Sequence, residues 1–174
     1  MATYDLPILG PMTIPGSSGV CFMDSVANQI AEQALPSVGG QLCFVFDCDN
    51  AADHGIYGCF NVPQNYVGTP VIVIKGILDG APGGGDDLAF GIRGMSVADN
   101  ETADATYNAE DTAQNTDISG WADEDLYLET IALSNFGALA AGDTAFFYFF
   151  LDASGSTYAG NFLLTDLIFR YDDA

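Results

Sequence analysis

The feature that most restricts the fold of this 174-residue chain is a series of short apolar runs separated by turn residues. The runs are rich in β-branched and aromatic side chains and end at Gly, Pro, Asp or Asn, which is typical of β-strands. The expected strands are residues 41–47, 55–62, 71–78, 88–97, 116–118, 126–133, 144–151 and 161–171. Because the strands do not alternate with helices, the pattern predicts an all-β, jelly-roll-like antiparallel sandwich, with a closed barrel as the alternative.

The chain before residue 41 differs from this pattern. Residues 1–20 are rich in Pro and Gly and are expected to form an extended N-terminal arm, which would either cross a neighbouring subunit or remain a flexible terminus. A short helix is predicted over residues 23–35, because Val26, Ile30 and Ala34 recur on one helical face. We therefore expect an arm over 1–20 and a single domain over 21–174, in which strands 41–47 and 55–62 pair as a hairpin.

Two of the expected strands, 71–74 and 146–151, are apolar without alternation. In an isolated sandwich each strand should alternate inward apolar with outward polar side chains. The outer faces of these strands must therefore be covered by the helix, by the arm or by another subunit, and we favour the subunit. The candidate interface residues are Phe146, Phe147, Tyr148, Phe149 and Phe150. A closed homo-oligomer, most simply a trimer, is expected.

The charge of the chain excludes several classes of partner. There are 24 acidic and 3 basic residues, which give a formal net charge of −21. So few cations cannot neutralise nucleic-acid phosphates, and anionic lipid would repel the chain. No apolar run approaches the ~20 residues that span a bilayer, and the first residues do not resemble a secretory signal. The acids either indicate a salty environment such as seawater, where cations screen their repulsion, or simply keep an apolar-rich chain soluble.

Two acid-rich segments are candidate cation sites. Asp47, Asp49 and Asp53 lie in one segment and Asp123 and Asp125 in another, and oxygen ligands of this kind suit Ca²⁺ or Mg²⁺. Neither segment has the glycine and terminal glutamate of an EF-hand loop. The alternative is that these carboxylates are solvated turn residues.

The chain offers few groups for catalysis. Cys21, Cys43, Cys48 and Cys59 have no zinc-site spacing and are expected to be buried thiols, with a disulfide from Cys59 to Cys43 or Cys48 as the alternative. The single histidine, His54, falls in a turn, and a G-x-S-x-G elbow is absent. We therefore expect no enzyme activity and no cofactor.

Several motifs carry a resemblance to a known group of proteins. A strand at 44–47 is followed at 62–74 by the pattern P-x-x-Y-x-G-x-P and a strand, and later by Gly142-Asp143 and a closing Phe169-Arg170-Tyr171. This combination resembles a β-sandwich module of marine phage virion proteins, found in capsid decoration (cement) proteins and in tail or fibre proteins. The resemblance covers residues 41–174.

The resemblance implies a non-enzymatic jelly roll on the outer capsid surface, assembled in the host cytoplasm, with itself (often as a trimer) and the major capsid protein as partners. A capsid decoration protein is therefore the leading hypothesis. A receptor- or glycan-binding head of a tail fibre is the alternative, and an acidic glycosidase is a third. Related modules often carry Arg and acidic residues after the Gly-Asp turn, whereas residues 146–151 are apolar here, which favours burial against a partner over sugar recognition.

Overall fold

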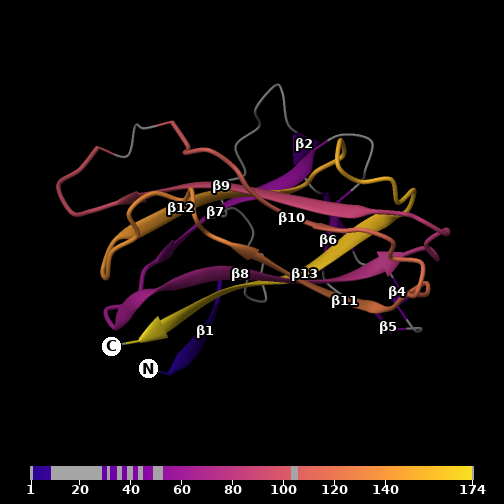
Figure 1. Cartoon of the computed structure of the whole chain (residues 1–174), viewed down its shortest axis with the longest axis horizontal. Coiled ribbons are helices and arrows are strands. Elements are labelled where there is room, and N and C mark those ends of the chain that lie inside the picture. Colours follow the sequence, from indigo (N-terminus) through magenta and orange to yellow (C-terminus); the bar gives the residue numbers. More distant parts are fainter. Residues whose placement is uncertain are drawn as a thin grey trace.

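The computed structural model describes residues 2–8, 29–30, 32–34, 37–38, 41–42, 45–48, 53–102 and 106–173. All of the described elements are strands, and all but two of them form two sheets that pack face to face as a sandwich (Figure 1). Among these residues there is no helix long and apolar enough to cross a membrane. The strands are β1 (Thr3–Pro7), β2 (Gln29–Ile30), β3 (Glu32–Ala34), β4 (Ser37–Val38), β5 (Gln41–Leu42), β6 (Val45–Cys48), β7 (His54–Asn61), β8 (Tyr66–Asp79), β9 (Leu88–Val97), β10 (Asp111–Asn115), β11 (Leu126–Ala132), β12 (Thr144–Leu151) and β13 (Asn161–Asp173). The short strands β4 and β5 pair with each other in a separate two-stranded sheet.

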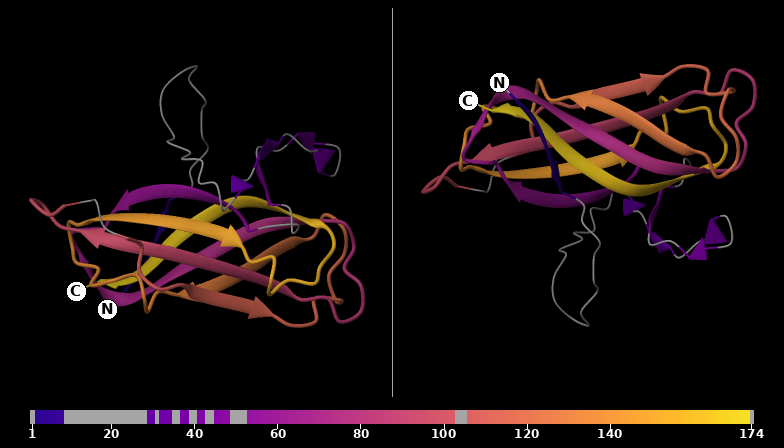
Figure 2. Two further views of the ribbon diagram at one scale, coloured as in Figure 1. Left: turned by 90° about the horizontal axis from the view of Figure 1, so that it is seen from above. Right: turned by 90° about the horizontal axis from the view of Figure 1, so that it is seen from below.

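From β6 onward, consecutive strands lie in opposite sheets, except that β9 and β10 share one sheet. The first sheet has the order β11-β8-β13-β6-β3, with β1 also paired to β13, and the second has the order β10-β9-β12-β7-β2. Every pair is antiparallel except β2 with β7. Seen from above and below, the long strands of the two sheets cross at an angle (Figure 2), as the twist of packed sheets requires.

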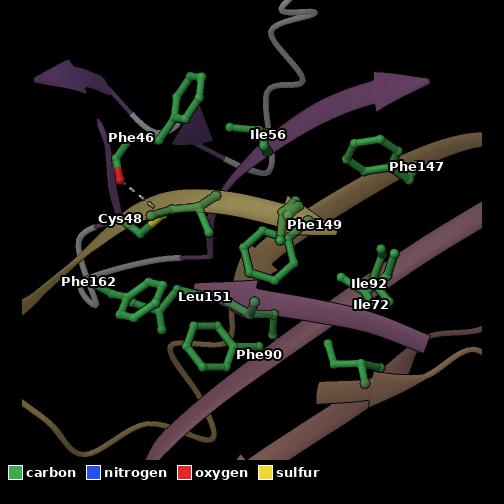
Figure 3. Close-up of a cluster of buried hydrophobic side chains, with 14 of the residues drawn as sticks. Phe46, Cys48, Ile56, Ile72, Phe90, Ile92, Phe147, Phe149, Leu151 and Phe162 are labelled. Carbon is green, nitrogen blue, oxygen red and sulfur yellow. Dashed lines mark hydrogen bonds between the residues drawn. The ribbon is translucent and has the colours of Figure 1, made fainter. Parts of the chain in front are cut away.

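The core between the sheets is dominated by aromatic rings. Phe90 of β9, Phe149 of β12 and Phe162 of β13 are fully buried, and Phe90 lies 5.8 Å from Phe149 and 4.9 Å from Phe162 between ring centroids (Figure 3). The close packing extends to the backbone, since a Cβ added at Gly94 would overlap the ring of Phe136. A strand glycine at this position makes room for a large ring on the same face.

The predicted N-terminal helix is wrong where the structure describes it. Residues 29–30 form β2, which pairs with β7, and residues 32–34 form β3, which pairs with β6. Backbone pairing at the two sheet edges outweighs a helical preference that amounts to tenths of a kcal/mol per residue. Residues 23–28, 31 and 35 lie outside the described residues.

The predicted hairpin between 41–47 and 55–62 is also wrong. β6 belongs to the first sheet and β7 to the second, so the two strands do not pair with each other. The short strand expected at 116–118 lies instead at 111–115 as β10, while Ile118 is buried in the core. The run at 41–47 is not a single strand, because residues 41–42 form β5, which pairs with β4, and residues 45–48 form β6 of the first sheet. The other strands occur where the sequence predicted them, although β8 begins earlier, at Tyr66.

The described part of the N-terminal arm pairs with its own chain. β1 adds to β13, with Asp5 opposite Arg170. The Arg170 guanidinium donates to both carboxylate oxygens of Asp5, at 2.6 and 2.9 Å, and lowers the pKa of that carboxyl. Residues 9–20 of the predicted arm lie outside the described residues.

Candidate functional site

The predicted interface residues divide between the two faces of β12. Phe147 and Phe149 point into the core between the sheets. Tyr148 and Phe150 lie on the opposite, outer face of the second sheet, yet each is only 2% exposed. Phe146, on the same outer face, is half-buried. The sequence therefore identified a buried strand, but the five residues do not form one surface.

The outer face of β12 is covered by other side chains of the same chain. The rings of Tyr57 and Tyr148 are stacked 4.4 Å apart, and Phe150 follows at 5.0 Å from Tyr148. Tyr107 stacks on Tyr57 at 6.4 Å, and the Arg93 guanidinium lies 5.4 Å from the Phe150 ring centroid. The apolar character of β12 therefore does not by itself require a second subunit, and contact through this strand stays a prediction.

The polar groups around this aromatic row are satisfied. Arg93 donates to Glu110 Oε2 from Nε and Nη2, at 3.2 and 2.9 Å. The Tyr148 hydroxyl donates to the Asp53 carbonyl at 3.1 Å. Burial, with smaller contributions from Tyr57 and Asp53, raises the pKa of Tyr148 well above its usual value. Tyr148 thus stays protonated and acts as a hydrogen-bond donor, not as a nucleophile.

The first sheet has a different outer face, and its edge strand β11 is apolar on both sides. Tyr127 and Ile131 are fully buried against the core, whereas the outward residues Leu126 and Leu128 are 61% and 52% exposed. Ile77 of β8 lies opposite Leu126. Leu126 and Leu128 are large hydrophobic side chains exposed on one face of an edge strand, so the surface of this strand is a candidate for contact with another protein.

A charged pair borders these leucines. Lys75 of β8 lies opposite Leu128 on one side and opposite Asp166 of β13 on the other. We call the outward side chains of Leu126, Leu128, Ile77, Lys75 and Asp166 the β11 face.

Asp166 occupies an unfavourable position in this face. It follows a β-bulge in β13, and its Oδ1 atom is buried without a hydrogen-bond partner. Burial raises the pKa of this carboxyl, and the attraction of Lys75 offsets only part of the effect. A carboxylate held in this way favours its neutral form more than a solvated one does.

Three of the cation candidates, Asp53, Asp123 and Asp125, lie among the described residues, and each accepts a backbone hydrogen bond. Asp123 Oδ1 accepts from the Gly80 amide at 2.8 Å, Asp125 Oδ2 from the Ala122 amide at 2.8 Å, and Asp53 Oδ1 from the Ala153 amide at 3.1 Å. The described residues contain no group of three or more His, Cys, Asp or Glu side chains that could hold a metal ion. Asp49 and the side chain of Asp47 lie outside the description. The three described carboxylates therefore act as acceptors in turns.

The cysteines and the histidine also differ from expectation. Cys48 is buried and its Sγ donates to the Phe46 carbonyl at 3.8 Å, as expected of a core thiol. Cys59 is a free, exposed thiol, so it is neither buried nor bonded to Cys48. Cys21 and Cys43 lie outside the described residues. His54 is the first residue of β7 and is 8% exposed, so it is not an exposed turn residue.

The motifs that carried the resemblance meet at one end of the sandwich. The Val62 amide donates to the Asp143 carbonyl at 2.8 Å, and the Gly142 amide donates to the Val62 carbonyl at 3.0 Å. The Tyr171 hydroxyl donates to Asn65 Oδ1 at 3.0 Å. These contacts join the P-x-x-Y, Gly-Asp and F-R-Y segments, and their role is to hold the ends of three strands together.

The sequence did not predict the surroundings of two sets of residues, the exposed leucines of β11 and the buried Asp111. The exposed Leu126 and Leu128 were visible only as partial alternation, because the sequence does not say which strand lies at a sheet edge. Asp111 is buried at 5% exposure and accepts hydrogen bonds from Ser134 and Asn135. No local motif distinguishes it from the many solvated acids.

Comparison with known proteins does not identify a family for this chain. No family model and no curated protein matches the chain. A solved structure, TmCBM61 in complex with β-1,4-galactotriose, aligns over 82% of this chain and 81% of its own, at 13% identity and a TM-score of 0.39.

Proposed function

We propose that this chain is a non-enzymatic jelly-roll protein that assembles on the outer surface of a virion, as a capsid decoration (cement) protein. Its partners in this proposal are the major capsid protein and further copies of itself. The proposal rests on the strand order, on the distribution of charge and, above all, on the exposed leucines of β11.

The strand order supports a jelly roll. Eight strands, β6 to β13, form two four-stranded sets with the orders β11-β8-β13-β6 and β10-β9-β12-β7. Among these eight strands, only β9 and β10 are neighbours both in the chain and in a sheet. Two interleaved Greek keys give this arrangement, which capsid and lectin domains share.

The distribution of charge supports an exterior position away from packaged nucleic acid. Of the three basic residues, Arg93 is paired with Glu110 and Arg170 with Asp5. Lys75 lies opposite Asp166. Because all three cations have carboxylate neighbours, the chain has none to spare for a phosphate backbone.

The observation that carries the assembly proposal is the pair Leu126 and Leu128, exposed at 61% and 52% on one face of an edge strand. Adjacent exposed leucines in a strongly acidic chain have no evident role in solubility, and such patches mark protein contacts.

The direct test is binding to capsids of the phage that encodes the chain. Purified protein is mixed with expanded capsids that lack it, and the bound fraction is measured by co-sedimentation over a range of concentrations. We expect saturation at a fixed number of copies per capsid. Binding that never saturates, or no binding at any concentration, would contradict a decoration role.

A glycan-binding head is the second candidate, and the outer face of the second sheet is the observation that favours it. Half-buried Tyr57 and Tyr107 lie there together with the Arg93–Glu110 pair. Tyr57 is, however, already stacked with both Tyr107 and Tyr148. A glycan array with the wild type and with Tyr57→Ala tests this candidate, which predicts saccharide signals that the variant loses.

A further inference from the structure

We propose that β1 is a releasable N-terminal strap: the carboxylates of Asp5 and Asp172 hold it on β13, and their protonation detaches it from a sandwich that stays folded. This inference goes beyond the assembly role, since it concerns how one strand of the first sheet is held. Release leaves residues 168–172 of β13 as an unpaired edge, to which another extended segment can add.

The first argument is that β1 is attached to the rest of the molecule through little buried surface. Among the described residues it pairs with β13 alone, from Thr3 opposite Asp172 to Pro7 opposite Ile168 (Figure 1). Four of its five residues are exposed, and the other, Leu6, packs partly against the core. A strand that buries so little apolar surface depends on its backbone pairing and on its polar side-chain contacts.

The second argument is that carboxylates make these polar contacts. The Arg170 guanidinium of β13 donates to both oxygens of Asp5, at 2.6 and 2.9 Å. The Thr3 hydroxyl donates to Asp172 Oδ1 at 3.0 Å. Hydrogen bonds to an ionised carboxylate are stronger than those to a neutral group. Both contacts therefore weaken when the carboxylate takes up a proton.

The third argument is that Asp172 also holds a strained residue in place. The Thr69 hydroxyl of β8 donates to Asp172 Oδ2 at 2.7 Å, so this carboxylate connects β1, β13 and β8. Thr69 has a φ of 53°, in the left-handed region that a β-branched residue rarely adopts. The register of β13 shifts on both sides of Asp172. Such strain persists only where neighbouring contacts impose it, so loss of the Asp172 charge favours a different local arrangement.

The direction of the pH dependence follows from the charges around β1. Among the described residues, the charged groups that contact or attract β1 are the amino terminus, Lys75 of β8, and Arg170, Asp172 and Asp173 of β13. The hydrogen bond from Arg170 lowers the pKa of Asp5. The hydrogen bonds from Thr69 and Thr3 lower the pKa of Asp172. Because docking lowers both pKa values, it is favoured above the ordinary carboxyl range and loses this stabilisation as the pH falls through the lowered values.

The test is hydrogen exchange of the full chain measured by NMR, expressed as protection relative to an unstructured peptide at the same pH. Two amides that bond across the β1–β13 pair are the reporters. The Ile8 amide donates to the Leu167 carbonyl at 2.8 Å, and the Asp173 amide donates to the carbonyl of residue 2 at 3.1 Å. We expect both reporters to lose protection by about 5- to 10-fold between pH 7 and pH 3, while the amides of β9 and β12 keep theirs.

Variants separate the two carboxylates from a general effect of acid. Asp5→Asn combined with Asp172→Asn should lower the protection of the reporters at pH 7 by a similar factor, and should remove most of their further fall at pH 3. The matched control is Asp117→Asn. Asp117 is also an exposed carboxylate whose pKa is lowered by hydrogen bonds, but it lies between β10 and β11. The control should behave as the wild type does.

Three results would overturn the inference: reporters that keep their protection at pH 3, reporters that lose it together with β9 and β12, or a double variant that matches the control. If the double variant does not fold, Thr3→Val decides, since it removes a hydroxyl contact with Asp172 from an exposed position. It should lower the protection of both reporters about two- to threefold at pH 7 and leave the amides of β9 and β12 unchanged. Unchanged reporters in this variant would also refute the strap.

Discussion

Asp111 is a buried carboxylate that joins the two sheets at the edge formed by β10 and β11. It is 5% exposed. Its Oδ1 accepts from Ser134 Oγ at 2.6 Å and from Asn135 Nδ2 at 3.1 Å, and the Asn135 amide donates to both carboxylate oxygens, at 3.0 and 2.9 Å. Asp111 begins β10 of the second sheet, whereas Ser134 and Asn135 follow β11 of the first. We predict that Asp111→Asn destabilises the fold.

The size of the effect follows from the hydrogen bonds. An asparagine keeps one acceptor oxygen and replaces the other by an NH₂ group, which would face the Asn135 amide, itself a donor. Hydrogen bonds to a charged group contribute about 1.5–3 kcal/mol each, and leaving a buried donor unsatisfied costs a similar amount. The free energy of unfolding should therefore fall by about 2–4 kcal/mol, a large share of the ~5–15 kcal/mol of a typical domain.

Urea unfolding followed by the fluorescence of Trp121, the single tryptophan, measures this loss. Trp121 is a suitable probe because its ring packs 5.3 Å from that of Tyr127 in β11. The control is Asp117→Asn, because Asp117 accepts hydrogen bonds from Ser119 and Gly85 but is exposed. Exposed groups exchange such bonds for water, so the control should change little. A loss below about 1 kcal/mol for Asp111→Asn, or equal losses in both variants, would refute the reasoning.

Asp166→Asn should raise the free energy of unfolding at neutral pH by about 1 kcal/mol, because it removes a partly buried charge without a partner at Oδ1. Folding raises the pKa of Asp166, so the free energy of unfolding of the wild type should fall as the pH rises from the ordinary carboxyl range through that raised pKa. The variant should lack this fall. A variant that is less stable than the wild type at neutral pH would contradict both points. Gly94→Ala should cost about 1–3 kcal/mol in urea unfolding, since its Cβ overlaps a core ring, whereas Gly120→Ala should cost much less because the space around Gly120 is open; equal losses would argue against the packing described. Iodoacetamide should label the exposed Cys59 in the native protein and the buried Cys48 only after unfolding, as peptide mapping by mass spectrometry can show; equal native labelling would contradict the burial of Cys48.

The sandwich could be predicted because its determinants are local. Turn residues end each apolar run, and the runs at 88–97 and 144–151 became β9 and β12 with the same bounds. The failures involved partners distant in sequence. Residues 29–34 have a helical pattern, but β2 and β3 are stabilised by pairing with β7 and β6. Whether two consecutive strands form a hairpin or cross between sheets also depends on the whole topology, so the 41–47 and 55–62 pairing was mispredicted.

The candidate surfaces were harder to predict for the same reason. The apolar run at 146–151 correctly indicated a strand buried on both sides, but its cover at Tyr148 includes Tyr57, which is 91 positions away in the chain. Conversely, the exposure of Leu126 and Leu128 arises because β11 is at an edge of the first sheet. Neither the neighbours of a strand nor its place in a sheet can be read from its own residues.

The most direct test of the proposed assembly role is a cryo-electron microscopy map of capsids incubated with the purified chain and compared with untreated capsids. The account predicts additional density of sandwich size at one repeating lattice position on the outer surface, at full occupancy. Untreated and treated capsids with identical maps, despite excess folded protein, would contradict it.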